Sequence, residues 1–176
     1  MARVLIALDL GGGYGHLRRC MPIADGLAAR GHDVSIAMRN SAYAAEVMGG
    51  RRHRVLATPA VAMPPGELAP VENWADVLLI TGHGRPGVLG ALLRGWRAIY
   101  ARERPDLVVC DFAPSALMAA SLDGLATVDI GSGYSPAPQL VPMAPIRFWA
   151  DVPPARLAAS EARALAAVNA ARAECG

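Results

Sequence analysis

A short apolar segment that runs straight into a glycine-rich loop opens the chain and limits its fold more than any other feature. Residues 3–10 form an apolar run typical of a strand buried on both faces, and residues 11–15 contain four glycines in five positions. A helix is expected from about Leu17 to Arg30. Pro22 should lie in or near its first turn, because a proline deeper in a helix removes a backbone hydrogen bond. A buried strand that leads directly into a helix is typical of a parallel α/β sheet.

Alternating strand and helix patterns continue along most of the 176 residues. Further strands are expected over 32–38, 55–62, 107–111 and 126–130, and further helices over 43–48, 72–80, 88–102 and 114–122. A proline-rich loop over 135–154 and an alanine-rich helix over 155–176 follow. Because helices separate the strands, we predict an α/β fold with a mainly parallel sheet and right-handed crossovers.

Composition excludes several classes of function. The net charge is only +2, so no nucleic-acid partner is expected. The chain contains no lysine, which excludes Schiff-base and P-loop lysine chemistry within it. Its three cysteines lack metal-ligand spacing, and no metal site is expected. No apolar stretch is long enough to span a bilayer, and Asp9 interrupts the first apolar run, so we expect a cytoplasmic protein with peripheral membrane contact left open.

The glycine-rich loop has more than one interpretation. In a dinucleotide-binding Gly-x-Gly-x-x-Gly motif, His16 or Arg18 would stand in place of the third glycine. Arg39 follows the second strand where an acid would hold a ribose, so NADP bound through its 2′-phosphate remains an alternative. The glycines could also simply permit a tight turn. We favour close approach of an anionic or phosphate-bearing ligand, because the loop amides and the helix N-terminus attract negative charge.

Two titratable residues follow strands at the same edge of the predicted sheet. His16 closes the glycine-rich loop, and Asp111 ends the strand over 107–111. If these strands are neighbours, the carboxylate can orient the imidazole and stabilise its protonated form, which makes histidine an effective general base. Asp111 has a second interpretation as a helix N-cap, because Pro114 begins a helix nearby. The residues alone leave these two interpretations open.

Two signatures resemble those of the GT-B glycosyltransferases. Residues 15–22 (Gly-His-Leu-Arg-Arg-Cys-Met-Pro), followed by residues 27–35 (Leu-Ala-Ala-Arg-Gly-His-Asp-Val-Ser), resemble the opening of these enzymes. Residues 104–111 (Arg-Pro-Asp-Leu-Val-Val-Cys-Asp) resemble a later segment of their N-terminal domain. The resemblance implies one Rossmann-like αβα sandwich, the acceptor-binding half of a GT-B fold, with a core over 1–134. It places the chain in the natural-product and antibiotic, UDP-glycosyltransferase-like branch.

The resemblance also implies an activity and its site. A hexosyltransferase of this kind moves a sugar from a nucleotide-sugar co-substrate, a UDP- or dTDP-sugar, to a hydroxyl of a small-molecule or lipid acceptor, without a further cofactor. It implies His16 as the general base and Asp111 as its partner. The candidates for substrate binding are Gly12, Gly13, Tyr14 and Gly15 in the first loop, His83 in a second glycine-rich loop, and Ser132, Gly133 and Tyr134 after the last strand. Turns or surface loops are the alternative for His83 and for the last three.

The family's C-terminal, donor-binding domain is not part of this sequence. We therefore expect the chain to need a nucleotide-sugar-binding domain or subunit as its partner and to be inactive alone. Two alternatives use the same residues differently: half of a GT-B-like nucleotide-sugar epimerase, and a non-catalytic module that binds a small molecule or a partner.

Overall fold

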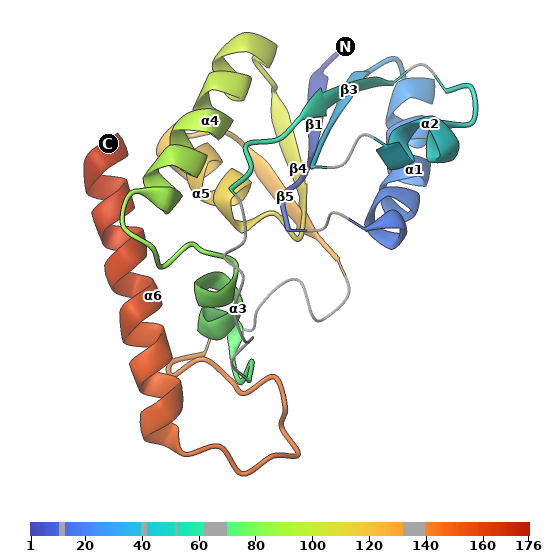
Figure 1. Ribbon diagram of the computed structural model, residues 1–176. Coiled ribbons are helices and arrows are strands. Elements are labelled where there is room, and N and C mark those ends of the chain that lie inside the picture. Colours follow the sequence, from blue (N-terminus) through green and yellow to red (C-terminus); the bar gives the residue numbers. More distant parts are fainter. Residues whose placement is uncertain (11–12, 40–41, 52, 62–69, 132–139) are drawn as a thin grey trace. The chain divides into compact units, whose positions relative to one another are not determined.

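The computed structural model describes residues 1–10, 13–39, 42–51, 53–61, 70–131 and 140–176 (Figure 1). Its strands are β1 (Arg3–Leu8), β2 (Asp33–Met38), β3 (Arg54–Ala57), β4 (Leu107–Asp111) and β5 (Thr127–Ile130). Its helices are α1 (Tyr14–Ala29), α2 (Ala42–Met48), α3 (Trp74–Ile80), α4 (Val88–Glu103), α5 (Pro114–Leu122) and α6 (Pro154–Cys175). All five strands form one sheet in the order β3-β2-β1-β4-β5, and every neighbouring pair is parallel. The predicted α/β fold with a parallel sheet is confirmed.

The chain divides into two compact units. The first contains Met1–Ala60 and Leu93–Pro136, and therefore the whole sheet. The second contains Val61–Leu92 and Ala137–Gly176, with α3 and α6. The predicted division into a core over 1–134, a loop over 135–154 and a helix over 155–176 stays a prediction.

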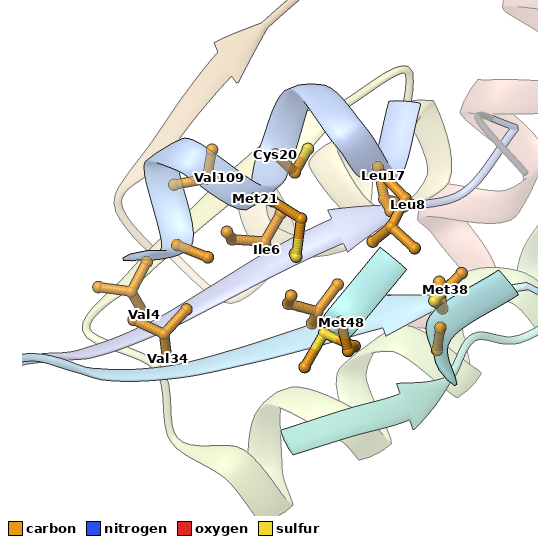
Figure 2. Close-up of a cluster of buried hydrophobic side chains, with 13 residues drawn as sticks. Val4, Ile6, Leu8, Leu17, Cys20, Met21, Val34, Met38, Met48 and Val109 are labelled. Carbon is orange, nitrogen blue, oxygen red and sulfur yellow. The ribbon is translucent and has the colours of Figure 1, made fainter. Parts of the chain in front are cut away.

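A buried cluster of apolar side chains attaches α1 to the sheet (Figure 2). The strands contribute Val4, Ile6, Leu8, Val34, Ile36, Met38 and Val109, and α1 contributes Leu17, Cys20, Met21 and Ala24. The strand residues alternate along each strand, and the helical residues recur every three or four positions, so each set lies on one face of its element. This packing holds the start of α1 close to the carboxyl end of β1.

Pro22 lies inside α1, so the prediction that it lies in or near the first turn is wrong. The helix begins at Tyr14 rather than near Leu17, which places Pro22 in the third turn. Proline there removes the hydrogen bond that would reach the Arg18 carbonyl. Pro22 is exposed, so the interruption lies on the solvent side while the opposite side of the helix is held by the apolar cluster.

Most other elements lie where the sequence predicts them, with one clear exception. The third strand was expected over 55–62, but β3 ends at Ala57. Only its first residues pair with β2, through the register Ser35–Arg54 to Met38–Ala57. Ala60 and Val61, the apolar residues after Ala57 that the structure describes in this segment, therefore do not extend the sheet.

Two further contacts of the first unit bear on its stability. Asp25 on α1 accepts hydrogen bonds from His53 Nε2 at 2.8 Å and from Arg51 Nε at 2.6 Å, and these bonds lower the pKa of its carboxyl group.

Gly95 on α4 packs against Pro59, and a Cβ at Gly95 would lie only 2.7 Å from a carbon of the proline ring. The close approach of α4 to this segment therefore requires glycine.

The second unit is organised around the buried Asn73 at the start of α3. Its side chain accepts a hydrogen bond from Asp76 N at 3.0 Å and donates one to the Leu157 carbonyl at 3.2 Å. Asp76 in turn accepts one from Arg156 Nη2 on α6 at 3.0 Å. These bonds cap α3 and tie it to α6.

Across the part of the chain that the structure describes, no helix combines the length and apolar character needed to cross a membrane.

Candidate active site at the carboxyl ends of β1 and β4

The order of the sheet reverses between β1 and β4. From β1 the chain builds outward through β2 and β3 on one side, and β4 and β5 lie on the other side. In open α/β sheets, ligands bind outside the carboxyl ends of the strands at such a switch point. Leu8 at the end of β1 pairs with Asp111 at the end of β4, so the condition set by the sequence, that these two strands are neighbours, is met.

The structure brings His16 and Asp111 together at this point. His16 Nδ1 lies 3.3 Å from Asp111 Oδ2. The Asp111 side chain has no exposed surface, whereas 27% of the His16 side chain is exposed. The imidazole therefore has its Nδ1 beside a buried carboxyl group, and Nε2 lies on the other side of the ring. This arrangement suits a histidine that exchanges protons with a ligand while a carboxylate orients it.

The Phe112 ring packs against one face of the His16 imidazole. The two rings are stacked, with 5.9 Å between the centroids and 13° between the planes. The backbone at Phe112 has a φ of +52°, in the left-handed region that residues other than glycine rarely adopt. The Phe112 carbonyl accepts a hydrogen bond from Leu10 N at 3.0 Å, which helps to hold this conformation. Strained backbone of this kind is found preferentially at functional sites.

Two more residues of α1 contact Asp111, and the sequence reasoning did not find them. Arg19 Nε lies 3.5 Å from Asp111 Oδ2, and the Cys20 thiol donates to the same oxygen at 3.6 Å. Their spacing from His16, three and four residues, places all three on one side of the helix and could have indicated them. Burial, reinforced by the charge of Asp111, raises the pKa of Cys20 to about 12. Cys20 is thus a thiol that donates a hydrogen bond rather than a nucleophile.

Asp9, not Asp111, caps α5. Asp9 Oδ2 accepts hydrogen bonds from the Ser115 backbone N at 3.0 Å and from the Ser115 hydroxyl. Trp96 Nε1 donates to the same hydroxyl at 3.0 Å. Side chains alternate across a strand, so Asp9 lies on the face of the sheet opposite Leu8 and α1. The N-cap interpretation of Asp111 is therefore wrong: another carboxyl group has that role, and Asp111 remains available to His16.

Packing does not require glycine at the two described glycine positions of the first loop, Gly13 and Gly15. Gly13 is the N-cap of α1 with an extended backbone, and a Cβ at Gly13 or Gly15 would meet nothing within 4 Å. Tyr14 lies toward α2, where its hydroxyl donates to Glu46 Oε1 at 3.0 Å. Substrate binding by these three residues stays a prediction. Gly12, Ser132, Gly133 and Tyr134 lie outside the described residues.

His83 belongs to the second unit. It is buried in the turn after α3, and its Nδ1 lies 2.9 Å from Thr81 Oγ1. This contact explains how the ring is oriented within its own unit. Its predicted role in acceptor binding is not tested by these contacts and stays a prediction.

Several buried polar atoms lie at the carboxyl edge of the sheet. Within the described ranges, Asp9 Oδ1, Asp111 Oδ1, Arg39 Nε and Thr58 Oγ1 have no hydrogen-bond partner. Buried polar atoms without partners in the protein are uncommon and are often satisfied by water or a ligand. No group of three His, Cys, Asp or Glu side chains suited to a metal ion occurs in the described part of the chain.

Comparisons with known proteins relate the chain to solved structures only. No protein-family model and no curated protein matches the sequence. SsfS6, a glycosyltransferase from Streptomyces sp. SF2575 in complex with thymidine diphosphate, aligns with 100% of this chain and 46% of its own, at 19% identity and a TM-score of 0.54. Another SsfS6 structure covers 73% of this chain and 39% of its own, at 20% identity and a TM-score of 0.52. The chain has the fold of part of a GT-B glycosyltransferase.

A third structure, the glycosyltransferase SnogD from Streptomyces nogalater, covers 74% of this chain and 33% of its own, at 25% identity and a TM-score of 0.47. The chain thus spans less than half the length of these GT-B structures. The Rossmann-like GT-B fold expected from the two sequence signatures is confirmed.

Proposed function

We propose that this chain is the acceptor-binding half of a glycosyltransferase, which moves a sugar from a nucleotide-sugar to a hydroxyl of a small-molecule or lipid acceptor. The observation that carries the proposal is the 3.3 Å contact between His16 Nδ1 and Asp111 Oδ2 at the switch point of the sheet. A partly exposed imidazole beside a fully buried carboxyl group is suited to general-base chemistry. The GT-B fold and the two sequence signatures agree with glycosyl transfer.

In this mechanism His16 donates its Nδ1–H to Asp111, so that Nε2 keeps a free electron pair. Nε2 removes the proton of the acceptor hydroxyl as that oxygen forms a bond to the anomeric carbon of the sugar. The bond between the anomeric carbon and the diphosphate oxygen breaks, and its electron pair leaves with the nucleoside diphosphate. The proton stays on His16, and the Asp111 carboxylate stabilises the resulting imidazolium.

The donor is expected to be a UDP- or dTDP-sugar held mainly by a further domain or subunit, and the chain alone is expected to be inactive. Thymidine diphosphate is bound in one of the SsfS6 structures. What this chain offers to a diphosphate is the start of α1, where the N-cap is Gly13 and no side chain caps the first turn. Uncapped backbone N–H groups and the helix dipole favour an anionic group there.

The test uses the complete enzyme with UDP-glucose and dTDP-glucose and a panel of phenolic and aliphatic alcohols. For His16→Ala and for Asp111→Asn we expect kcat to fall by roughly 100- to 10,000-fold, the usual contribution of a general base. Acceptor affinity, measured by titration, should change little. The matched control is His32→Ala, because His32 lies before β2, at the opposite edge of the sheet.

Unchanged turnover in His16→Ala would remove the assignment of the base. Tight acceptor binding without any transfer by the wild-type enzyme would favour the non-catalytic alternative, and sugar epimerisation without an acceptor would favour the epimerase.

A further inference from the structure

Arg19 contacts both members of the His16–Asp111 pair. Its Nε lies 3.5 Å from Asp111 Oδ2, and its Nη2 lies 3.4 Å from His16 Nδ1. About a third of its side chain, 35%, is exposed. Nη2 is a hydrogen-bond donor, and it lies beside Nδ1, the nitrogen that must itself carry a proton and act as a donor in the proposed mechanism.

These contacts cannot all be hydrogen bonds at once. In a neutral imidazole, Nδ1 either carries a proton and donates, or carries none and accepts. Donation to Asp111 requires the proton on Nδ1 and leaves Nε2 free to act as a base. Donation from Arg19 to Nδ1 requires the proton on Nε2, and in that tautomer Nε2 cannot remove a proton from a ligand. Arg19 and Asp111 thus favour opposite tautomers of His16.

Crowding on one carboxylate oxygen strengthens this competition. Asp111 Oδ2 is approached by three donors: His16 Nδ1 at 3.3 Å, Arg19 Nε at 3.5 Å and Cys20 Sγ at 3.6 Å. Oδ1 is buried and has no hydrogen-bond partner in the part of the chain that the structure describes. One oxygen cannot give three donors good geometry together, so strengthening one of these contacts weakens the others.

We propose that Arg19 sets the tautomer of His16 and thereby regulates how much of the enzyme is ready for catalysis. In the molecules in which Arg19 Nη2 donates to His16 Nδ1, the imidazole proton is on Nε2, and His16 cannot act as a base. These molecules form the inactive share of the enzyme. When Arg19 moves away from Nδ1, the ring is committed to the tautomer that donates to Asp111. The catalytic consequence rests on the proposed role of His16, and Arg19 acts only through His16, as a positioning residue.

The test reads the tautomer directly, without substrate. Nitrogen NMR of the histidine-labelled full chain gives the chemical shifts of His16 Nδ1 and Nε2, taken at a pH where the ring is neutral. For Arg19→Met we expect the ratio of the Nδ1–H to the Nε2–H tautomer to rise about five-fold, which corresponds to about 1 kcal/mol, one ordinary hydrogen bond.

The matched control is Arg18→Met. Arg18 is the neighbouring arginine on the same helix, and its guanidinium carbon lies 5.2 Å from the centre of the Tyr14 ring. This variant should leave the His16 shifts as in the wild type. Arg19→Leu, whose side chain has no hydrogen-bond donor, serves as a second variant if Arg19→Met does not fold. Wild-type shifts in a folded Arg19 variant would overturn the inference.

The two proposals fail in different experiments. Turnover of His16→Ala tests the role of the base, whereas the nitrogen shifts test Arg19 with no substrate present. A second readout joins them: if the inference holds, folded Arg19→Met should show a higher kcat than the wild type with little change in acceptor affinity, and a lower kcat would contradict it. A loss of acceptor affinity at unchanged kcat would contradict it.

Discussion

The hydrogen bonds of Ser115 allow a prediction whose size follows from the structure. Ser115 is fully buried; its hydroxyl accepts from Trp96 Nε1 at 3.0 Å and donates to Asp9. In Ser115→Ala, the indole N–H loses the Ser115 hydroxyl as its acceptor, and Asp9 loses one of the two donors that Ser115 provides. An unpaired buried donor costs about 1–3 kcal/mol and a hydrogen bond to a carboxylate contributes about 1.5–3 kcal/mol. Alanine recovers a few tenths through its helix propensity. We expect a net loss of roughly 2–5.5 kcal/mol.

Urea unfolding measures this loss. With a typical dependence of about 2 kcal/mol per molar urea, the midpoint should fall by roughly 1–3 M. The control is Ser121→Ala on the same helix, where the serine is exposed, and its free energy of unfolding should stay within about 0.5 kcal/mol of the wild type. If both variants unfold at the same urea concentration, the network from Trp96 to Asp9 does not stabilise the fold, and the reasoning is refuted.

Three further predictions concern packing, pH and thiol reactivity. Gly95→Ala should destabilise the fold by about 1–2 kcal/mol, because its methyl group clashes with Pro59. Gly26→Ala should stabilise the fold by about 0.5–1 kcal/mol, because its methyl group meets only the end of the Arg30 side chain. Shifts of the melting temperature with the same sign in both variants would contradict this. Because the pKa of Asp25 is lower in the folded than in the unfolded state, its carboxylate stabilises the fold above the unfolded pKa, and this contribution is lost as the pH falls through the folded pKa. The difference in free energy of unfolding between the wild type and Asp25→Asn should therefore disappear below about pH 4. A difference that does not change with pH argues against this. Burial raises the pKa of Cys20 and of Cys110 to about 12, so mass spectrometry should find neither alkylated by iodoacetamide at neutral pH until urea is added; rapid native labelling would disprove their burial.

The strands and helices of this chain are largely predictable, because their signals are local. The apolar runs of β1 and β4 and the proline that starts α5 identify those elements without any tertiary information. The sequence predicts too late a start for α1, because its N-cap is Gly13, which has no side chain to mark the beginning of the helix. The position of Pro22 inside α1 is not predictable from the sequence, because the exposure of that side of the helix, where a lost hydrogen bond is tolerated, is a tertiary property.

The candidate site was predictable in part. His16 and Asp111 follow strands and could be named, and the helical spacing of Arg19 and Cys20 relative to His16 is visible in the sequence. The contact between His16 and Asp111 requires β1 and β4 to be neighbours in the sheet. The order of the strands is set by the way in which the long crossover connections pack on the sheet, which is a tertiary property. The helical spacing places Arg19 beside His16 but does not show its contact with Asp111, because the two residues are far apart in the sequence.

The sequence by itself indicated that His16 and Asp111 follow strands at the carboxyl edge of a parallel sheet, and it left open whether Asp111 meets His16 or caps the helix that begins at Pro114. Only the tertiary structure decided between these two roles. Side chains alternate across a strand, and the register pairs Leu8 with Asp111. Asp111 therefore lies on the face covered by α1, where His16 and Arg19 compete for it, and Asp9 lies on the opposite face, where it caps α5.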